Sequence, residues 1–157
     1  MNPHHPLFGD IQRYGPARIL PSETGSRRMR SPLVPQTLLH NVVSLYLSVL
    51  DAEVRGCAPR ERQLAIDLTR KWVPEVSDAV IGATVDTASH AARSGHRLDA
   101  EAVAAELCAA LPPAGRRRLV SDLGLLARAD GHLTQREAEA IALARCLLLT
   151  HPQSAVH

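Results

Sequence analysis

Apolar residues recur every three to four positions along most of the chain, which is the spacing of a buried face on an α-helix. The pattern is clear between residues 119 and 127, where Leu119, Leu123 and Leu126 are one turn apart. The same periodicity predicts helices over about 36–53, 59–72, 75–93, 99–111 and 135–149, and one that starts at about residue 116. We therefore expect an all-α protein, a compact bundle of six or seven helices.

The segment 127–137 predicts a tight turn between two of these helices. Asp130 and Gly131 follow an apolar helical stripe, and glycine can take the left-handed conformation that closes a helix. Thr134 and Glu137 have the spacing of a capping box, in which the hydroxyl and the carboxylate each bind the other residue's backbone N–H. The segment thus predicts a helix–loop–helix with acidic residues at the joint.

Three regions differ in composition along the chain. Residues 1–35 hold six of the eleven prolines and a net charge of +3, from five arginines against one aspartate and one glutamate. A proline-broken segment with few apolar residues gains too little from burial to offset its ordering entropy. We expect residues 1–35 to be a flexible, disordered arm, residues 36–150 to form the helical domain, and residues 151–157 to be a short tail.

The two ends of the helical domain resemble one another. Residues 43–72 and 120–147 each read as an apolar helix, a break that contains glycine, and an Arg-Glu pair that enters a second apolar helix. This similarity predicts two related helical hairpins. The first joint departs from the second, because Arg55-Gly56 replaces Asp-Gly and Ala58 stands at the capping position.

Composition narrows the class of protein further. Hydrophobic residues make up 45% of the chain but aromatics only 3%, which favours close-packed helices over a β-sandwich. A net charge of +2, without aromatics among the basic residues, argues against nucleic-acid binding. Three cysteines with no Cys-x-x-Cys spacing argue against a disulfide framework or zinc knuckle, and we expect Cys108 and Cys146 to be buried. With no run of 18 apolar residues for a transmembrane segment, the expected location is cytoplasmic.

The second joint also resembles a known family. Ala129-Asp130-Gly131, a hydrophobic residue, Thr134, two further positions and Glu137, between two apolar helices, is similar to the TerB-like (tellurite resistance) family and to the N-terminal region of the DjlA co-chaperones. The match is best over residues 98–149 and weaker over 36–72. The resemblance implies a non-enzymatic module in bacterial stress or tellurite and metal resistance, which acts by docking to partner proteins.

The resemblance also implies a cation-attracting acidic patch at the joints. Its strongest candidate ligands are Asp130 and Glu137, and its weaker ones are Asp51, Glu53 and Glu61. Carboxylate oxygens suit Ca²⁺ or Mg²⁺, whereas a nitrogen ligand from His132 would suit Zn²⁺. The loop lacks the alternating oxygen ligands of an EF-hand. The alternative is that Asp130 and Glu137 only bind backbone N–H groups and hold no ion.

Two other classes of function stay open. A structural adaptor would bind an acidic protein or a membrane surface peripherally, through the arginines of the arm (27–30) or through Arg116–Arg118. A thiol-dependent enzyme would use Cys57, which lies between Arg55 and Arg60, cations that favour the thiolate. No Walker loop, dinucleotide fingerprint, Gly-x-Ser-x-Gly or His-Glu-x-x-His motif occurs. The sequence leaves the oligomeric state open.

Overall fold

The computed structural model describes residues 33–50, 57–96 and 99–150. Across these ranges the chain forms six α-helices and no strand, which confirms the all-α class. The helices are α1 (Leu33–Val49), α3 (Pro59–Arg70), α4 (Asp78–Arg93), α5 (Ala100–Ala110), α6 (Pro113–Leu126) and α7 (Gln135–Leu149). Most of the predicted arm, residues 1–32, and the predicted tail lie outside the described residues.

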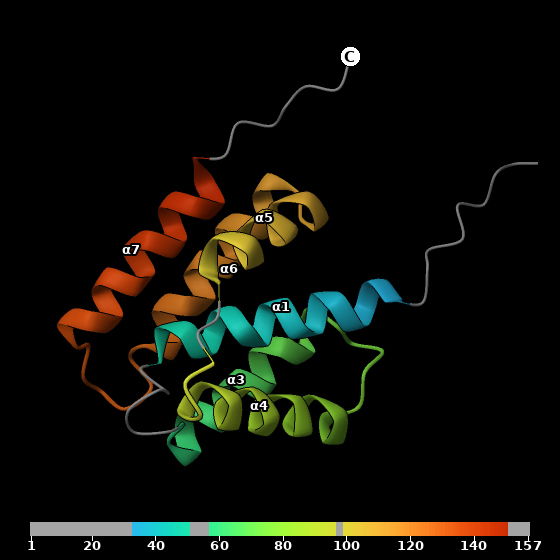
Figure 1. The fold of residues 1–157 in the computed structure, drawn as a ribbon, viewed down its shortest axis with the longest axis horizontal. Helices are drawn as coiled ribbons and strands as arrows, with labels where there is room; N and C mark the ends of the chain where they lie inside the picture. Colours follow the sequence, from blue (N-terminus) through green and yellow to red (C-terminus); the bar gives the residue numbers. More distant parts are fainter. Residues whose placement is uncertain (1–32, 51–56, 97–98, 151–157) are drawn as a thin grey trace, which may run out of the picture.

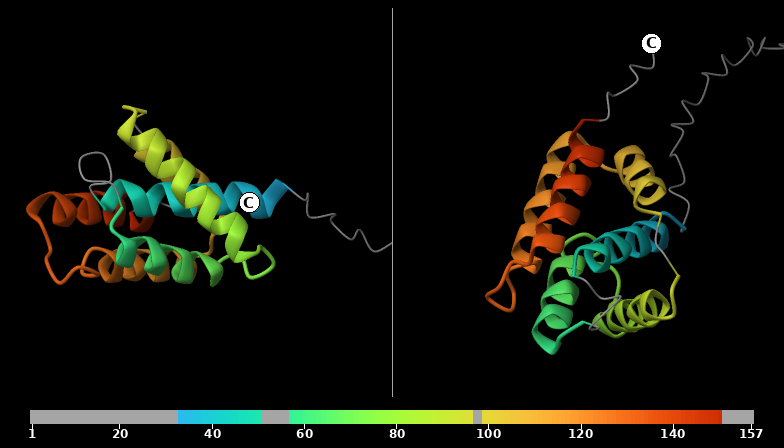
Figure 2. Two further views of the ribbon diagram at one scale, coloured as in Figure 1. Left: turned by 90° about the horizontal axis from the view of Figure 1, so that it is seen from below. Right: turned by 60° about the vertical axis from the view of Figure 1, so that its left-hand side comes forward.

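Helix α1 is the centre of the fold and contacts each of the other five helices. Helices α3 and α4 lie on one side of it, and α6 and α7 lie on the other (Figures 1 and 2). Its buried side chains cover a broad face of the helix, while His40 and Ser48 are exposed on the opposite face. The buried side chains are Leu39, Val42, Val43, Leu45, Tyr46, Leu47 and Val49, followed by Leu50 just beyond the helix.

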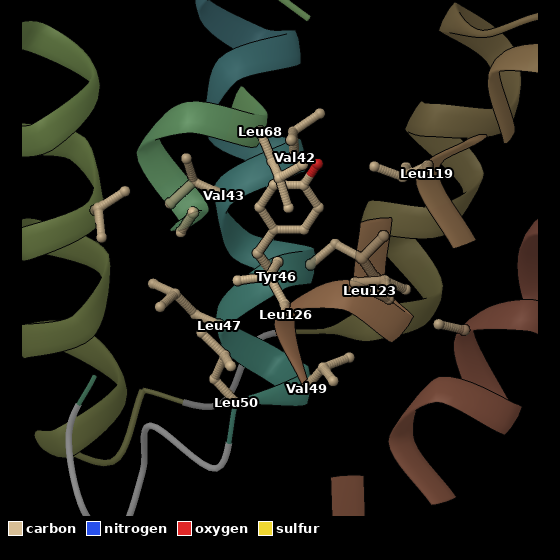
Figure 3. Close-up of a cluster of buried hydrophobic side chains, with 14 of the residues drawn as sticks. Val42, Val43, Tyr46, Leu47, Val49, Leu50, Leu68, Leu119, Leu123 and Leu126 are labelled. Atoms are coloured by element: carbon tan, nitrogen blue, oxygen red, sulfur yellow. The ribbon is translucent and has the colours of Figure 1, made fainter. Parts of the chain in front are cut away.

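The ends of α1 and α6 meet in this core. Val49, Leu50 and Leu126 belong to one buried cluster (Figure 3). Since α1 ends at Val49 and α6 ends at Leu126, both helices terminate at the same end of the bundle (Figure 1). The chain therefore leaves both helices toward the two predicted joints from neighbouring points.

Three helices begin at residues other than those predicted. Helix α1 begins at Leu33, because Pro35 falls within its first turn, where a backbone N–H has no helical partner to lose. Helix α4 begins at Asp78 rather than near residue 75, since the side chain of Ser77 caps it. Helix α6 begins at Pro113, so the proline pair that was expected to end the preceding helix also starts the next one.

Candidate functional site

The joint between α6 and α7 turns through a left-handed glycine. Gly131 has a φ of 85°, a conformation that side chains with a Cβ rarely adopt, which confirms the predicted turn. Asp130 is exposed, and its Oδ1 accepts a hydrogen bond of 2.9 Å from the backbone N–H of His132. His132 is exposed as well. This hydrogen bond from an exposed side chain therefore stabilises the turn of the loop.

Glu137 lies inside this joint, and the predicted capping box is confirmed. Its side chain is only 2% exposed. Oε2 accepts hydrogen bonds from the Thr134 backbone N–H (2.8 Å) and from the Thr134 hydroxyl (2.9 Å), while the Glu137 N–H donates to Thr134 Oγ1 (3.2 Å). The carboxylate is therefore engaged in starting α7.

The joint before α3 has one of the two hydrogen bonds of such a capping box. Glu61 is 7% exposed, and its Oε2 accepts a hydrogen bond of 2.7 Å from the backbone N–H of Ala58. Alanine has no hydroxyl, so the reciprocal bond is missing. Equivalent buried glutamates at the third position of α3 and of α7 support the predicted relationship between the two hairpins. Asp51 and Glu53 lie outside the described residues.

The described part of the joints supplies few donors for a cation. A hard cation such as Ca²⁺ takes six to eight oxygen ligands. Asp130 and Glu137 each already accept hydrogen bonds through one oxygen, Oδ1 and Oε2 respectively. Within residues 33–50, 57–96 and 99–150, no three His, Cys, Asp or Glu side chains gather as a metal site would require. These residues therefore fit a cation only in part, and metal binding stays a prediction.

A buried carboxylate that the sequence did not reveal joins α1, α6 and the turn just after α3. Asp122 on α6 is 5% exposed. Its Oδ2 accepts hydrogen bonds of 3.0 Å from the Tyr46 hydroxyl and of 3.0 Å from Trp72 Nε1. Asp122 falls at i+3 from Leu119 and i−4 from Leu126, inside the apolar stripe of α6. A charged residue within such a stripe is the signal that could have found it.

Burial changes the acidity of Tyr46. The pKa of its hydroxyl is raised far above the ordinary value, first because burial disfavours the phenolate and second because Asp122 places a negative charge beside it. The hydroxyl therefore stays protonated and acts as a donor. The network connects α1, α6 and the residues just after α3 through hydrogen bonds in the core.

Arg116, Arg117 and Arg118 do not form one exposed basic face. Arg116 is 5% exposed, and its Nη1 donates to the carbonyl of Leu148 (3.3 Å) at the end of α7. Arg118 lies with its guanidinium carbon 5.2 Å from the centre of the Trp72 ring. Successive helical positions point about 100° apart. Arg117 and Arg118 are both exposed, so two of the three arginines remain at the surface and Arg116 does not.

The three cysteines lie in different surroundings, and two of them differ from the sequence-based expectation. The pKa of Cys57 is raised to about 11, first by burial and then by the negative charge of Glu61, which together outweigh Arg62. The expectation of an activated thiolate is therefore wrong. Cys108 is half-buried and packs against the core, but Cys146 is exposed, because α7 lies at the edge of the bundle and turns Ala144 and Leu148 inward instead.

Comparison with known proteins gives one result. A family model described as tellurite resistance protein TerB matches residues 41–156. No curated protein matches significantly, and no solved structure does. Among the described residues, no helix is long and apolar enough to cross a membrane.

Proposed function

The chain belongs to the TerB family of tellurite resistance proteins, and from that membership we propose that it is a non-enzymatic helical module in the bacterial response to tellurite or metal stress. It acts by docking to partner proteins. The observation that carries this proposal is the family match, which spans residues 41–156 and so includes nearly all of the described fold.

The polar side chains described above stabilise the fold, and these structural roles support docking rather than catalysis. Glu61 and Glu137 start helices, and Asp122 joins three segments of the core through aromatic donors. The Cys57 thiol is held protonated near neutral pH by burial and by Glu61. These groups stabilise a defined helical surface, which is what a docking module needs. A cytoplasmic location is part of the proposal, because all three cysteines are free thiols.

A divalent cation at the joints is a second proposal. The position of the ends of α1 and α6 at the same end of the bundle (Figure 1) favours it, since Asp51 follows Leu50 directly in the chain and Asp130 comes four residues after Leu126. Carboxylates from both joints, together with water, would supply the oxygen ligands of Ca²⁺ or Mg²⁺. The cation would bias the shape of the docking surface without taking part in any reaction.

The experiment for the docking proposal is cross-linking inside the native bacterium. Cells that express the full chain at its natural level are treated with a cross-linker, with and without tellurite, and the linked peptides are identified. The proposal expects links from helical residues to a defined partner that increase under tellurite. Links confined to the chain itself under both conditions would contradict it.

A further inference from the structure

One face of α6 stays open to solvent after the helix has packed against α1, α3, α5 and α7. Arg117, Ser121, Leu125 and Arg128 are all exposed, and they follow one another at intervals of four, four and three positions, which places them on one side of a helix. Arg128 continues this side just beyond α6, because its backbone N–H donates to the carbonyl of Leu125 at 3.2 Å. These four residues form a single exposed row, called here the α6 stripe.

The α6 stripe carries positive charge at both ends. Arg117 and Arg128 are separated by about 16 Å along the helix, from a rise of about 1.5 Å per residue. Arg118 adds a second exposed guanidinium at the first end, with its central carbon 5.2 Å from the centre of the Trp72 ring. Among the described residues, no carboxylate lies within ion-pair distance of these three arginines. Asp122, the one carboxylate within α6, is buried in the core, so the charge of the stripe is available to another molecule.

The middle of the α6 stripe is apolar and can be approached closely. Leu125 is 54% exposed, the highest fraction among the large exposed hydrophobic residues of the described chain. Gly124 precedes it, and a Cβ added to Gly124 would meet no atom within 4 Å. The packing of the protein therefore does not require a glycine here, although alanine would make a more stable helix. The absent side chain leaves open space beside Leu125 for a group of another molecule.

Cations at two ends and an apolar middle are complementary to an acidic protein segment. Arginine binds a carboxylate through two parallel N–H···O hydrogen bonds, and the contact with Trp72 restrains the guanidinium of Arg118 before any partner arrives. A nucleic acid carries a charge at every nucleotide and stacks its bases on exposed aromatic rings, and the α6 stripe contains no aromatic residue. A membrane surface would need a wider apolar face than a single leucine. The charge and the apolar middle together therefore favour a protein partner.

We propose that the α6 stripe binds an acidic segment of a partner protein. Carboxylates of that segment meet the arginines at the two ends of the stripe, and an apolar side chain between them packs on Leu125 beside Gly124. The inference rests on the proposed docking function and adds to it the surface and the chemistry of the contact.

Site-specific photo-cross-linking of the full chain in the native bacterium tests the α6 stripe. The photoreactive residue p-benzoylphenylalanine replaces Ser121, at the centre of the stripe, and in a control strain it replaces Ala105, which is exposed on α5. The linked peptides are then identified by mass spectrometry. Position 121 should link to a segment of another protein with a net negative charge, and position 105 should not link to that segment. Links from position 121 to a second copy of the chain, to nucleic acid, to lipid or to an uncharged or basic segment would overturn the inference, as would no link at all.

Matched variants, each carrying the photoreactive residue at position 121, test the two features of the stripe separately. Arg117→Gln combined with Arg128→Gln removes the charge at both ends and should lower the yield of the link about tenfold. Arg93→Gln combined with Arg145→Gln removes the same charge from exposed positions elsewhere and should leave the yield unchanged. Gly124→Leu fills the open space and should lower the yield at least about threefold while it raises the melting temperature, since leucine stabilises a helix more than glycine does. A wild-type yield in either stripe variant, or an equal loss in the control pair, would overturn the inference.

The outcome also separates this inference from the docking proposal. If general cross-linking joins a partner to other helices while position 121 stays unlinked, the inference fails and docking stands. If neither method joins a partner to the chain, both fail.

Discussion

The hydroxyl of Tyr46 donates a hydrogen bond of 3.0 Å to Oδ2 of Asp122, across 76 positions of sequence. Tyr46 lies at the centre of the core on α1 (Figure 3), and Asp122 is buried on α6. Trp72, just beyond α3, donates to the same oxygen at 3.0 Å. One carboxylate thus fixes how three helical segments meet, and the surface that those segments form depends on it.

Loss of this carboxylate should destabilise the fold. Asp122→Ala leaves the Tyr46 hydroxyl buried without its acceptor, so we expect the free energy of unfolding to fall by about 1–3 kcal/mol. Tyr46→Phe should cost a similar amount by leaving Asp122 with a single donor. Urea denaturation followed by circular dichroism measures both. Ser121→Ala, at the exposed neighbouring position, is the control and should change the value by less than about 0.5 kcal/mol.

The ionisation of Tyr46 should lower the free energy of unfolding at alkaline pH. The pKa of Tyr46 is raised in the folded protein, while an unfolded tyrosine ionises at about pH 10. The contribution of Tyr46 to stability is therefore complete below about pH 10 and is lost as the pH rises above it. Absorbance at 295 nm should show Tyr46 ionising only as the protein unfolds. A Tyr46→Phe variant whose stability falls just as steeply above pH 10 would refute this assignment.

Cys57 should react slowly with alkylating reagents. Its pKa of about 11 leaves little thiolate at pH 8, whereas an ordinary thiol has a pKa of about 8.5. Mass spectrometry after timed iodoacetamide treatment should show Cys146, which is exposed, modified well before Cys57. Glu61→Gln should speed the alkylation of Cys57, because it removes the nearby negative charge. The amide oxygen of glutamine can still accept the hydrogen bond from the Ala58 backbone N–H. Equal alkylation rates for Cys57 and Cys146 would contradict a raised pKa of Cys57.

Variants at the α6–α7 joint separate capping from cation binding. Glu137→Ala removes the capping bonds and should cost about 1 kcal/mol in metal-free buffer, whereas Glu137→Gln keeps an acceptor for Thr134 and should cost less. The cation proposal expects millimolar Ca²⁺, Mg²⁺ or Zn²⁺ to raise the melting temperature of the wild type. Asp130→Asn combined with Glu137→Gln should abolish that increment. A melting temperature that no cation changes would end the cation proposal and leave the fold untouched.

The helices could be predicted because their signals are local. Apolar periodicity, Gly131 at the turn and the Thr134–Glu137 capping box each depend on residues within one or two turns. The predicted helix ends were wrong where a residue type suits more than one position at the end of a helix. Pro113 reads as a helix stop but starts α6, and Ser77 reads as part of a helix but caps α4.

Much of the candidate site depended on tertiary contacts that the sequence does not state. Arg116 and Asp122 are polar residues whose burial is decided by partners 32 and 76 positions away. The acidity of Cys57 was predicted in the wrong direction, because burial and Glu61 act more strongly on it than the arginines nearby in sequence.

Survival under tellurite tests the central claim most directly. The gene is deleted from the native bacterium, and growth is measured over a series of tellurite concentrations with the full chain, the Asp122→Ala variant or an empty vector supplied in trans. The account predicts that deletion lowers the tolerated tellurite concentration, that the full chain restores it, and that Asp122→Ala restores less in proportion to its lost stability. Identical tolerance in the deleted and restored strains would contradict the account.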